Sequence, residues 1–375
     1  MDKQSDVVPI AMEETIDDVI DVDPNQEIVD VGYDITSYGA DFLVDGLITR
    51  MSAADIVVPT FDPAFSAESG AEGFQRHFVW TKPQADRFLE SLLLGMPVPG
   101  IFLVREPNGI FLVLDGHQRL RSLASFYEGV FREKEYTLEY VQDTWRGLRY
   151  RDLEDEDRRR LDNSIIHATI LRQDDPARNY RAIYSIFERI NTGGTALQPQ
   201  EIRVALFGGP FIQLIRELNR DTHWRALYGP RSNRLKDQEL ILRFLALYED
   251  SKSYKRPVKG FLNDYLARNA RRGNGESADL VKVFRATVQT INESLGPKAF
   301  RPVRSLNAAV LDAVMVGVAR RLEAGRVTAP QTWARAYATL LKRDAFTEAT
   351  GSSTAAEDSV ASRLTLATAD FSTVR

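Results

Sequence analysis

Short apolar runs of the kind that form strands are concentrated in one part of this 375-residue chain. Ile101–Val104 and Ile110–Leu114 are rich in β-branched and aromatic residues, and Arg105–Gly109 between them contains Pro-Asn-Gly. Because Pro, Asn and Gly favour tight turns, the three segments predict a β-hairpin. Ile165–Leu171 predicts one more strand, whereas the apolar residues beyond it recur at helical spacing. The pattern therefore predicts an α+β domain followed by an all-α helical domain.

The second predicted strand leads directly into a turn and a helix. Asp115-Gly-His-Gln-Arg119 follows the strand, and Leu120, Leu123 and Tyr127 then lie at helical spacing. Gly129 is a typical residue after the last turn of a helix. This order of strand, glycine turn and helix is the local feature on which the functional interpretation depends.

Helical patterns account for most of the rest. One helix is predicted to begin at Thr81, where Pro83 suits the first turn and Gln84 completes a capping box, and to end at Gly95. Further helices are predicted over residues 152–161, 180–190, 199–207, 211–219, 238–248, 281–295, 305–324 and 330–342. The predicted domains are an acidic arm over 1–49, the α+β domain over 50–175, the helical domain over 176–345 and a Ser/Thr/Ala-rich tail over 346–375, whose end is expected to be loosely ordered.

Charge is distributed unevenly along the chain. The net charge is −5, but residues 1–49 contain 13 acidic residues and one lysine, whereas residues 50–375 contain 40 acidic and 47 basic residues, a net charge of +7. Acidic arms of this kind are usually disordered and solubilising. The alternative is that the arm competes with nucleic acid for a basic groove.

No segment has the character of a membrane span or a signal peptide. The longest stretch without a charged residue, Ser91–Val104, has 14 residues and is interrupted by glycine and proline, so it is too short to cross a bilayer. The N-terminus lacks a basic start followed by an apolar core. We therefore expect a cytoplasmic protein without membrane partners.

The residue inventory excludes several kinds of chemistry. The chain has no cysteine, which rules out disulfides and thiolate ligands. We find no Walker A loop, no His-Glu-x-x-His and no dinucleotide-binding glycine motif. The four histidines are His77, His117, His167 and His223, so no histidine-based nuclease module is expected in the C-terminal part. No acidic constellation points to a particular metal site.

Asp115–Arg119 allows two interpretations. The first turn of a helix offers backbone N–H groups and the positive end of the helix dipole, which suit a phosphate, and Gly116 would let the backbone approach it. Arg119 would otherwise be unfavourable there, and arginine recognises phosphate well. Alternatively, Asp115 and Gln118 form a capping box and Arg119 pairs with Asp115 or another acid. His117 is then a polar turn residue.

Asn191-Thr192-Gly193-Gly194 is a second candidate site. Asn and Gly commonly end helices, but the same residues can form a nest of N–H groups that holds an anion. The flanking Glu188, Arg189, Glu201 and Arg203 are expected to be solvated surface. Two basic stretches, Lys252–Lys259 with Tyr254 and Arg268–Arg272, fit either solvated surface or contacts with nucleic acid.

Four sets of residues, in this order, resemble the GmrSD N-terminal family, which has a ParB/sulfiredoxin-like core. They are Arg76 with Trp80 and Gln84, Glu90-Ser-Leu-Leu-Leu-Gly-Met-Pro-Val-Pro-Gly100, Leu114-Asp-Gly-His-Gln-Arg-Leu120, and Ile186-Phe-Glu-Arg-Ile-Asn-Thr-Gly-Gly194 with Leu197 and Glu201-Ile-Arg203. The resemblance covers about residues 76–263.

The resemblance implies a component of a prokaryotic defence (restriction-type) system that acts on foreign or modified DNA. It implies binding and hydrolysis of a nucleoside triphosphate with Mg²⁺, which makes the chain an NTPase. The expected catalytic residues are Asp115, His117, Gln118 and Arg119. The expected cofactor-binding residues are Arg76, Gly116, Asn191, Thr192, Gly193 and Gly194.

The chain departs from the family pattern in two respects. His117 stands where the family usually has Gln, and we expect it to titrate near neutral pH. The C-terminal HNH nuclease domain of many members is expected to be absent. A partner protein then supplies the nuclease, or the ParB-like domain nicks DNA itself. The alternative function is a non-catalytic DNA- or protein-binding module of the same fold. A homo-oligomer is a further expectation that the sequence leaves open.

Overall fold

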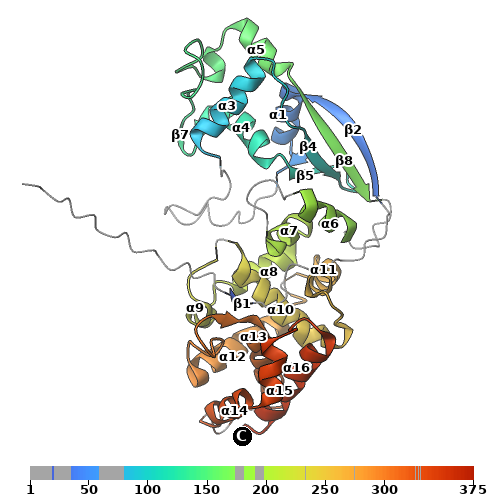
Figure 1. Ribbon diagram of the computed structural model, residues 1–375, viewed down its shortest axis with the longest axis vertical. Coiled ribbons are helices and arrows are strands. Elements are labelled where there is room, and N and C mark those ends of the chain that lie inside the picture. The colour runs from blue at the N-terminus through green and yellow to red at the C-terminus, as the bar shows by residue number, and fades with distance from the viewer. Residues whose placement is uncertain are drawn as a thin grey trace, which may run out of the picture. The chain divides into compact units, whose positions relative to one another are not determined.

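The computed structural model describes residues 19–20, 35–58, 80–173, 181–190, 198–232, 234–273, 275–325, 327, 329 and 331–375. The chain divides into two compact units. We call Val29–Gly208 the sheet unit, and Gly209–Arg375 together with Met1–Ile28 the helical unit (Figure 1).

The sheet unit is built on a five-stranded mixed sheet with the order β2-β8-β4-β5-β3. Its strands are β2 (Ile35–Leu43), β3 (Ile56–Val57), β4 (Ile101–Arg105), β5 (Phe111–Asp115) and β8 (Ile165–Gln173). β4 pairs antiparallel with β5 and parallel with β8, and β2 pairs antiparallel with β8. A small hairpin is formed by β6 (Val130–Phe131) and β7 (Lys134–Glu135).

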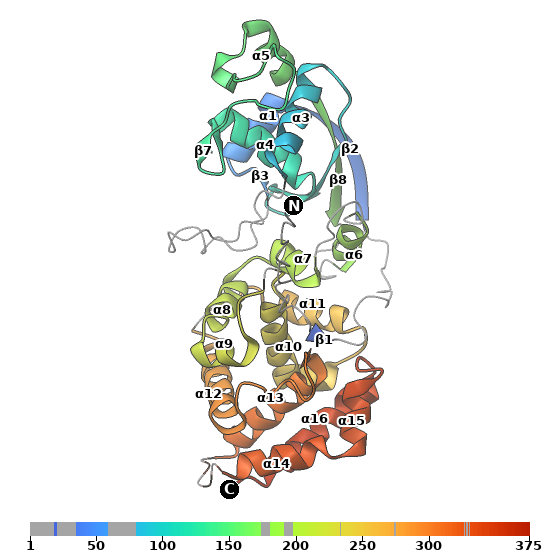
Figure 2. The same ribbon diagram turned by 60° about the vertical axis from the view of Figure 1, so that its left-hand side comes forward.

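Helices cover one face of this sheet. They are α1 (Val44–Ser52), α3 (Lys82–Leu93) and α4 (His117–Glu128), on the same side of the strands in Figures 1 and 2. Their buried residues pack against Ile166, Ala168 and Ile170 of β8, whereas Ile165 and His167 point to the other face and are exposed. The other elements are η1 (Tyr150–Asp152), α5 (Asp155–Asp162), α6 (Arg181–Ile190) and α7 (Pro199–Leu206).

Local sequence signals explain why these elements form where they do. Gly109 has φ +88° between β4 and β5, as the predicted hairpin turn requires. α3 begins after Thr81, whose backbone N–H donates to Oε1 of Gln84 at 2.9 Å, and it is followed by Gly95 at φ +70°. The predicted hairpin and the capping-box pair at the start of α3 are confirmed.

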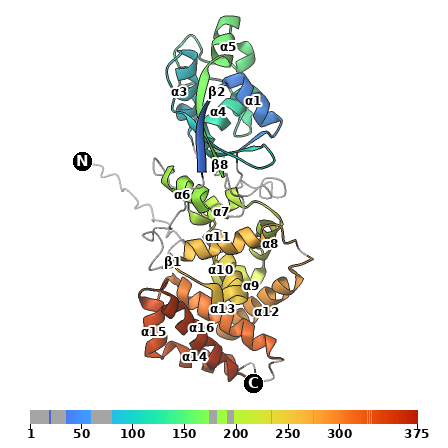
Figure 3. The same cartoon turned by 90° about the vertical axis from the view of Figure 1, so that its right-hand side faces the viewer.

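The helical unit is organised around one almost completely buried helix, α13 (Ala308–Glu323). Its neighbours include α10 (Lys236–Asp250), α12 (Ala278–Leu295) and α16 (Glu357–Ser372) (Figure 3). A helix that is apolar on all sides has to be enclosed by others, which the 12 buried residues of α13 confirm. The remaining elements are α8 (Pro210–Leu218), α9 (Thr222–Tyr228), η3 (Ser251–Ser253), α11 (Val258–Asn269), α14 (Thr332–Leu341), α15 (Asp344–Gly351) and the short strands β1 (Val19–Ile20) and β9 (Leu306–Asn307).

The chain is therefore mixed α/β with a central sheet, and all seven helices predicted beyond residue 175 are present, as α6, α7, α8, α10, α12, α13 and α14. No helix in the described part of the chain is long and apolar enough to cross a membrane.

Three expected boundaries are wrong. The acidic arm was expected to extend to residue 49, but β2 and most of α1 lie within it. β2 is an edge strand whose residues are mostly exposed, so it lacks an apolar signal. The predicted division at 175 is also displaced, because α6 and α7 belong to the sheet unit.

The third wrong expectation concerns the Ser/Thr/Ala-rich tail, because α15 and α16 occupy most of residues 346–375. A Cβ added to Gly317 of α13 would lie 2.8 Å from Phe371 and 3.1 Å from the Cβ of Ala367, both on α16. The small residues of this segment allow two helices to approach closely, and they do not form a loose tail.

Candidate functional site

A single left-handed glycine joins β5 to α4. Gly116 has φ +96° and is the N-cap of α4, with Asp115 still in the strand opposite Phe102. A Cβ at this position would lie 2.4 Å from Cγ2 of Ile101, the first residue of β4. Both the backbone conformation and the close packing therefore require glycine here. The predicted strand, glycine turn and helix are confirmed.

The same geometry excludes the capping-box interpretation. A box formed by Asp115 and Gln118 would need Asp115 as the N-cap, but the helix begins one residue later and its N-cap makes no side-chain hydrogen bond. The N–H groups of the first helical turn have no acceptor within the helix. Such N–H groups, together with the helix dipole, favour an anion.

Arg119 folds back from the first turn of α4 toward the strands. Its Nη2 donates to Oδ2 of Asp115 at 2.8 Å and to the carbonyl of Gly100 at 2.9 Å. The Arg119 side chain is 13% exposed and the Asp115 side chain 39% exposed. The Nε of Arg119 is buried and has no hydrogen-bond partner among the described residues. The predicted pairing with Asp115 is thus present, while one buried donor of the guanidinium remains unsatisfied.

His117 turns inward. Its Nε2 lies 2.7 Å from the carbonyl of Val113, to which it donates, and its ring packs edge-on against Phe187 of α6 with 6.4 Å between the ring centroids. Burial, together with the smaller effect of the positive charges of Arg121 and Arg119, lowers the pKa of His117 to about 4. The expectation that His117 titrates near neutral pH is therefore wrong. At pH 7 the imidazole is neutral, with its proton on the nitrogen that faces Val113.

Gln118 connects α4 to the start of α3. Its Oε1 accepts a hydrogen bond from the backbone N–H of Trp80 at 3.1 Å. Trp80 packs edge-on against Phe88 of α3, with 5.6 Å between the ring centroids. The amide of Gln118 thus helps to place the chain that enters α3 beside the first turn of α4.

Arg121 belongs to the same surroundings, although the sequence analysis did not select it. It lies one helical turn after His117, and burial lowers its pKa to about 10. The charges of both Arg121 and Arg119 act on His117, which shows that α4 brings two arginines close to the junction. A second arginine two residues after Arg119 was the sequence signal that could have identified it.

Two of the predicted binding elements lie outside the described residues. These are Arg76 and the segment Asn191, Thr192, Gly193 and Gly194, and their roles remain predictions. The helix before that segment, α6, packs against β5 and places Phe187 on His117.

The helix after that segment differs from expectation, because Glu201 and Arg203 are each only 1% exposed. A solvated surface was predicted for both. Instead, Glu201 accepts a hydrogen bond from the backbone N–H of Gln198 at 2.7 Å, and Arg203 donates to Gln200 at 3.2 Å. The buried ionisable residues of α7 were hidden from sequence analysis because burial depends on contacts between distant parts of the chain.

The described residues contain no group of three or more His, Asp or Glu side chains that could hold a metal ion. Asp115 is the junction's partly exposed carboxylate. Mg²⁺ in phosphate-transfer sites is commonly held by one or two carboxylates together with phosphate oxygens and water. The carboxylate of Asp115 is a suitable ligand of this kind for Mg²⁺.

Comparison with known proteins places this site in a family. Residues 69–208 match the family model of the GmrSD restriction endonuclease, N-terminal domain. The match includes the β4–β5 hairpin, the junction and α4. No curated protein and no solved structure matches the chain. Residues 69–208 therefore belong to the GmrSD N-terminal domain family.

Proposed function

We propose that this chain is the nucleotide-binding component of a restriction-type defence system that acts on DNA. Its sheet unit would have a ParB/sulfiredoxin-like fold and hydrolyse a nucleoside triphosphate in the presence of Mg²⁺. The family match supports the restriction context, because the matching family is named for a restriction endonuclease. The junction between β5 and α4 supports the nucleotide part of the proposal.

One observation carries the proposal, namely the unsatisfied buried Nε of Arg119 beside the first turn of α4, whose N-cap makes no side-chain hydrogen bond. A cation is unfavourable at a helix N-terminus by about 0.3–1 kcal/mol, and a phosphate placed there reverses the sign of that interaction. Backbone N–H groups and a guanidinium are both suitable donors to phosphate oxygens. The residues present therefore fit a bound phosphate chain.

Roles for the other residues follow from their contacts. Asp115 holds Arg119 in place and is exposed enough to contribute one oxygen ligand to Mg²⁺, which would neutralise charge on the phosphates. The Nε2 of His117 is occupied by Val113, so only Nδ1 remains to orient a water molecule. Since the ring is neutral at pH 7, Nδ1 would accept and not donate a hydrogen bond.

The alternative function is a binding module that contacts DNA or a partner protein without turnover, with a nuclease supplied by the partner. The inward hydrogen bonds of His117 and Gln118 favour this alternative. Both side chains already hold the junction together, which leaves fewer groups to position a nucleophilic water. Nucleotide would then be a passive ligand.

Nucleotide turnover by the full chain distinguishes the two functions. ATP and GTP would be tested with Mg²⁺, with and without DNA, beside Arg119→Ala and Asp115→Asn. Arg146→Ala is the matched control, because Arg146 pairs with Asp143 at 2.9 Å in the same unit but is exposed. We expect nucleotide affinity to fall at least about tenfold in Arg119→Ala, the loss of about 1.4 kcal/mol typical of a charged hydrogen bond.

Three outcomes can be distinguished. Turnover that is lost in Asp115→Asn and Arg119→Ala but kept in Arg146→Ala supports an NTPase with its site at the junction. Binding without turnover supports the passive module. Unchanged nucleotide affinity in a folded Arg119→Ala protein would contradict a phosphate site at α4 altogether.

A further inference from the structure

One edge of the five-stranded sheet is long and regular. β2 is the outermost strand on that side, and its nine residues pair with β8 without a break in register. It borders the sheet in Figure 1, and this edge faces the viewer in Figure 3. Sheets usually keep an edge strand short, or protect it with lysine, proline or a bulge, because an open edge pairs readily with another strand. The opposite edge strand, β3, has only two residues, whereas β2 has none of these protections.

The backbone of β2 presents hydrogen-bonding groups along its outer side. In an antiparallel pair, residues whose N–H and C=O groups point toward the neighbouring strand alternate with residues whose groups point away. The N–H of Val44 donates to the carbonyl of Ser164 at 3.0 Å, directly after the last β2–β8 pair, so the even-numbered residues of β2 face β8. The odd-numbered residues face outward, and they are Ile35, Ser37, Gly39, Asp41 and Leu43. Among the described residues, their outward groups have no backbone hydrogen-bond partner.

Two exposed aliphatic side chains lie beside this edge. Leu43 of β2 is directly opposite Ile165 of β8, so both side chains point to the face that α1, α3 and α4 leave uncovered. They are 44% and 59% exposed. Outward-facing backbone groups next to exposed apolar side chains fit a further strand that carries an apolar residue at this position.

The sequence of β2 is complementary to a second copy of itself in the antiparallel direction. When a two-fold axis passes through Gly39, all nine residues overlap and the outward-facing residues of one copy meet those of the other. Leu43 then lies opposite Ile35 of the second copy, which extends the aliphatic contact with Ile165. A register moved by one residue would set outward-facing groups against inward-facing ones, and a register moved by two would shorten the overlap.

The remaining pairs of this register are also compatible. On the open face, Asp41 lies opposite Ser37 of the second copy, whose hydroxyl can donate a hydrogen bond to the carboxylate. Since Asp41 is the only charged residue of β2, no like charges face each other across the axis. On the other face each aromatic residue lies opposite a smaller one, namely Phe42 opposite Thr36 and Tyr38 opposite Ala40.

Asp41 is already positioned for this contact. The Nδ1 of His167 lies 2.8 Å from Oδ1 of Asp41. A Cβ at Gly39 would lie 2.8 Å from Cε1 of His167, so the imidazole ring lies over the glycine in the middle of β2. The ring holds one carboxylate oxygen in place and leaves the Asp41 side chain 64% exposed. Gly39 thus allows His167 to orient the carboxylate that would meet Ser37 of the second copy.

We propose that the chain forms a symmetric dimer in which β2 pairs antiparallel with β2 of a second copy about an axis at Gly39. The two five-stranded sheets then become one continuous sheet. About ten backbone hydrogen bonds cross the axis, two for each outward-facing residue of β2 and its counterpart. The inference does not depend on the proposed function, because β2 contributes no residue to the β5–α4 junction.

Sedimentation velocity of the full chain over a range of protein concentrations tests the inference. The unaltered protein should form a species of twice the chain mass of 42.3 kDa. In Ser37→Asp a second carboxylate lies opposite Asp41, and symmetry produces this like-charge pair twice. Ser37→Asn is the matched control, because asparagine has nearly the same size as aspartate and no charge.

We expect Ser37→Asp to weaken dimer formation about tenfold, since like charges directly opposite each other in a sheet are unfavourable, and Ser37→Asn to change it by less than about threefold. Combining Ser37→Asp with Asp41→Lys places opposite charges across the axis and should return dimer formation to within about threefold of the control. Such recovery is specific to pairing between copies, because residues 37 and 41 of one strand are about 13 Å apart.

Three results would overturn the inference. A monomer at every concentration would leave the edge to a strand of a different protein. A dimer that Ser37→Asp and Ser37→Asn affect equally would be joined through another surface. A dimer that Ser37→Asp weakens and Asp41→Lys does not restore would contradict the register at Gly39. Circular dichroism verifies that each variant is folded, and sedimentation is measured without nucleotide, so these results are independent of the proposed NTPase activity.

Discussion

At the scale of single residues, His117 is held neutral by its surroundings. Its pKa of about 4 in the folded protein lies below the ordinary value of 6.5, because the ring is buried and two arginines lie nearby. As the pH falls below about 7, His117 becomes protonated in the unfolded chain but stays neutral in the folded protein. The contribution of His117 to the free energy of unfolding is therefore fully present when the pH is above its pKa in the unfolded chain. It is lost as the pH falls toward its pKa in the folded protein.

This difference predicts a specific pH dependence. Relative to His117→Gln, whose side chain does not titrate, the unaltered protein should lose about 2 kcal/mol of unfolding free energy between pH 7 and pH 5. Urea unfolding of both proteins at the two pH values measures it. Equal pH dependence in the two proteins would mean that His117 is not held neutral.

At the scale of secondary-structure elements, the angle between β5 and α4 depends on Gly116. Substitution by alanine forces a side chain into a left-handed backbone and places its Cβ 2.4 Å from Ile101. The strain of the left-handed backbone at alanine costs about 1 kcal/mol, and the clash of its Cβ with Ile101 costs about 1–3 kcal/mol. We therefore expect Gly116→Ala to lower the free energy of unfolding by about 2–4 kcal/mol. Thermal or urea unfolding provides the value.

Gly109 offers a matched control on the neighbouring turn. It also has a positive φ, +88°, but a Cβ there meets no atom within 4 Å. Gly109→Ala should therefore show only the backbone cost of about 1 kcal/mol. If the two substitutions were equally destabilising, close packing against Ile101 would not be what fixes the junction.

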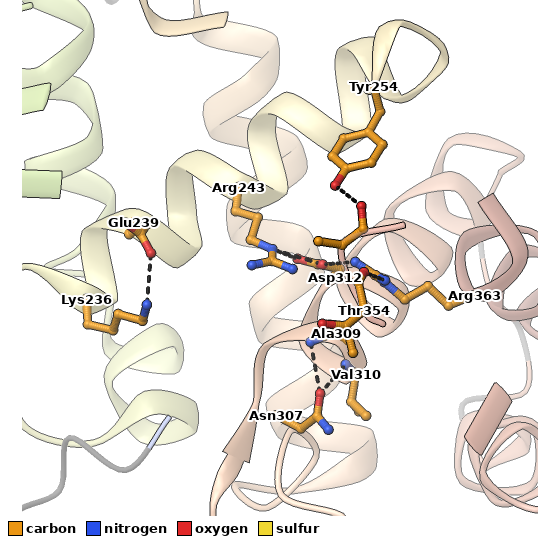
Figure 4. A network of polar contacts seen from close by, with 11 residues as sticks. Lys236, Glu239, Arg243, Tyr254, Asn307, Ala309, Val310, Asp312, Thr354 and Arg363 are labelled. Atoms are coloured by element: carbon orange, nitrogen blue, oxygen red, sulfur yellow. Dashed lines mark hydrogen bonds and ion pairs between the residues drawn. The ribbon is translucent and has the colours of Figure 1, made fainter. Parts of the chain in front are cut away.

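At the scale of the whole molecule, the helical unit has a stabilising centre of its own. In the helical unit this centre is Asp312, which joins three helices through Arg243 and Arg363. Asp312→Asn removes the carboxylate that pairs with both buried guanidinium groups (Figure 4). We expect a loss of about 3–5 kcal/mol, as is typical when one partner of a buried ion pair is removed.

Hydrogen exchange locates this loss, because it reports opening of each part of a structure separately. Amides of α10, α13 and α16 should exchange faster in Asp312→Asn, while those of β4 and β5 in the sheet unit stay unchanged. Asp279→Asn is the control, since Asp279 pairs with Lys282 but is 94% exposed, and it should cost less than about 0.5 kcal/mol. A loss of protection spread equally over both units would contradict the assignment.

The elements of the candidate site could be predicted from the sequence better than their contacts could. The β4–β5 hairpin and the helix after Gly116 follow from turn residues and periodicity that act over a few positions. The edge strand β2 was missed because its exposed residues carry no apolar pattern. It exists because it pairs with β8, more than one hundred residues away.

The amino-acid sequence by itself determined the order of strand, glycine turn and helix, and the segregation of charge between the two ends of the chain. Both are properties of neighbouring residues. Only the tertiary structure decided that Arg119 bonds to Gly100, that His117 is neutral and that Glu201 and Arg203 are buried. The physical reason is that desolvation and hydrogen-bond geometry depend on atoms brought together from distant positions, which no local pattern encodes.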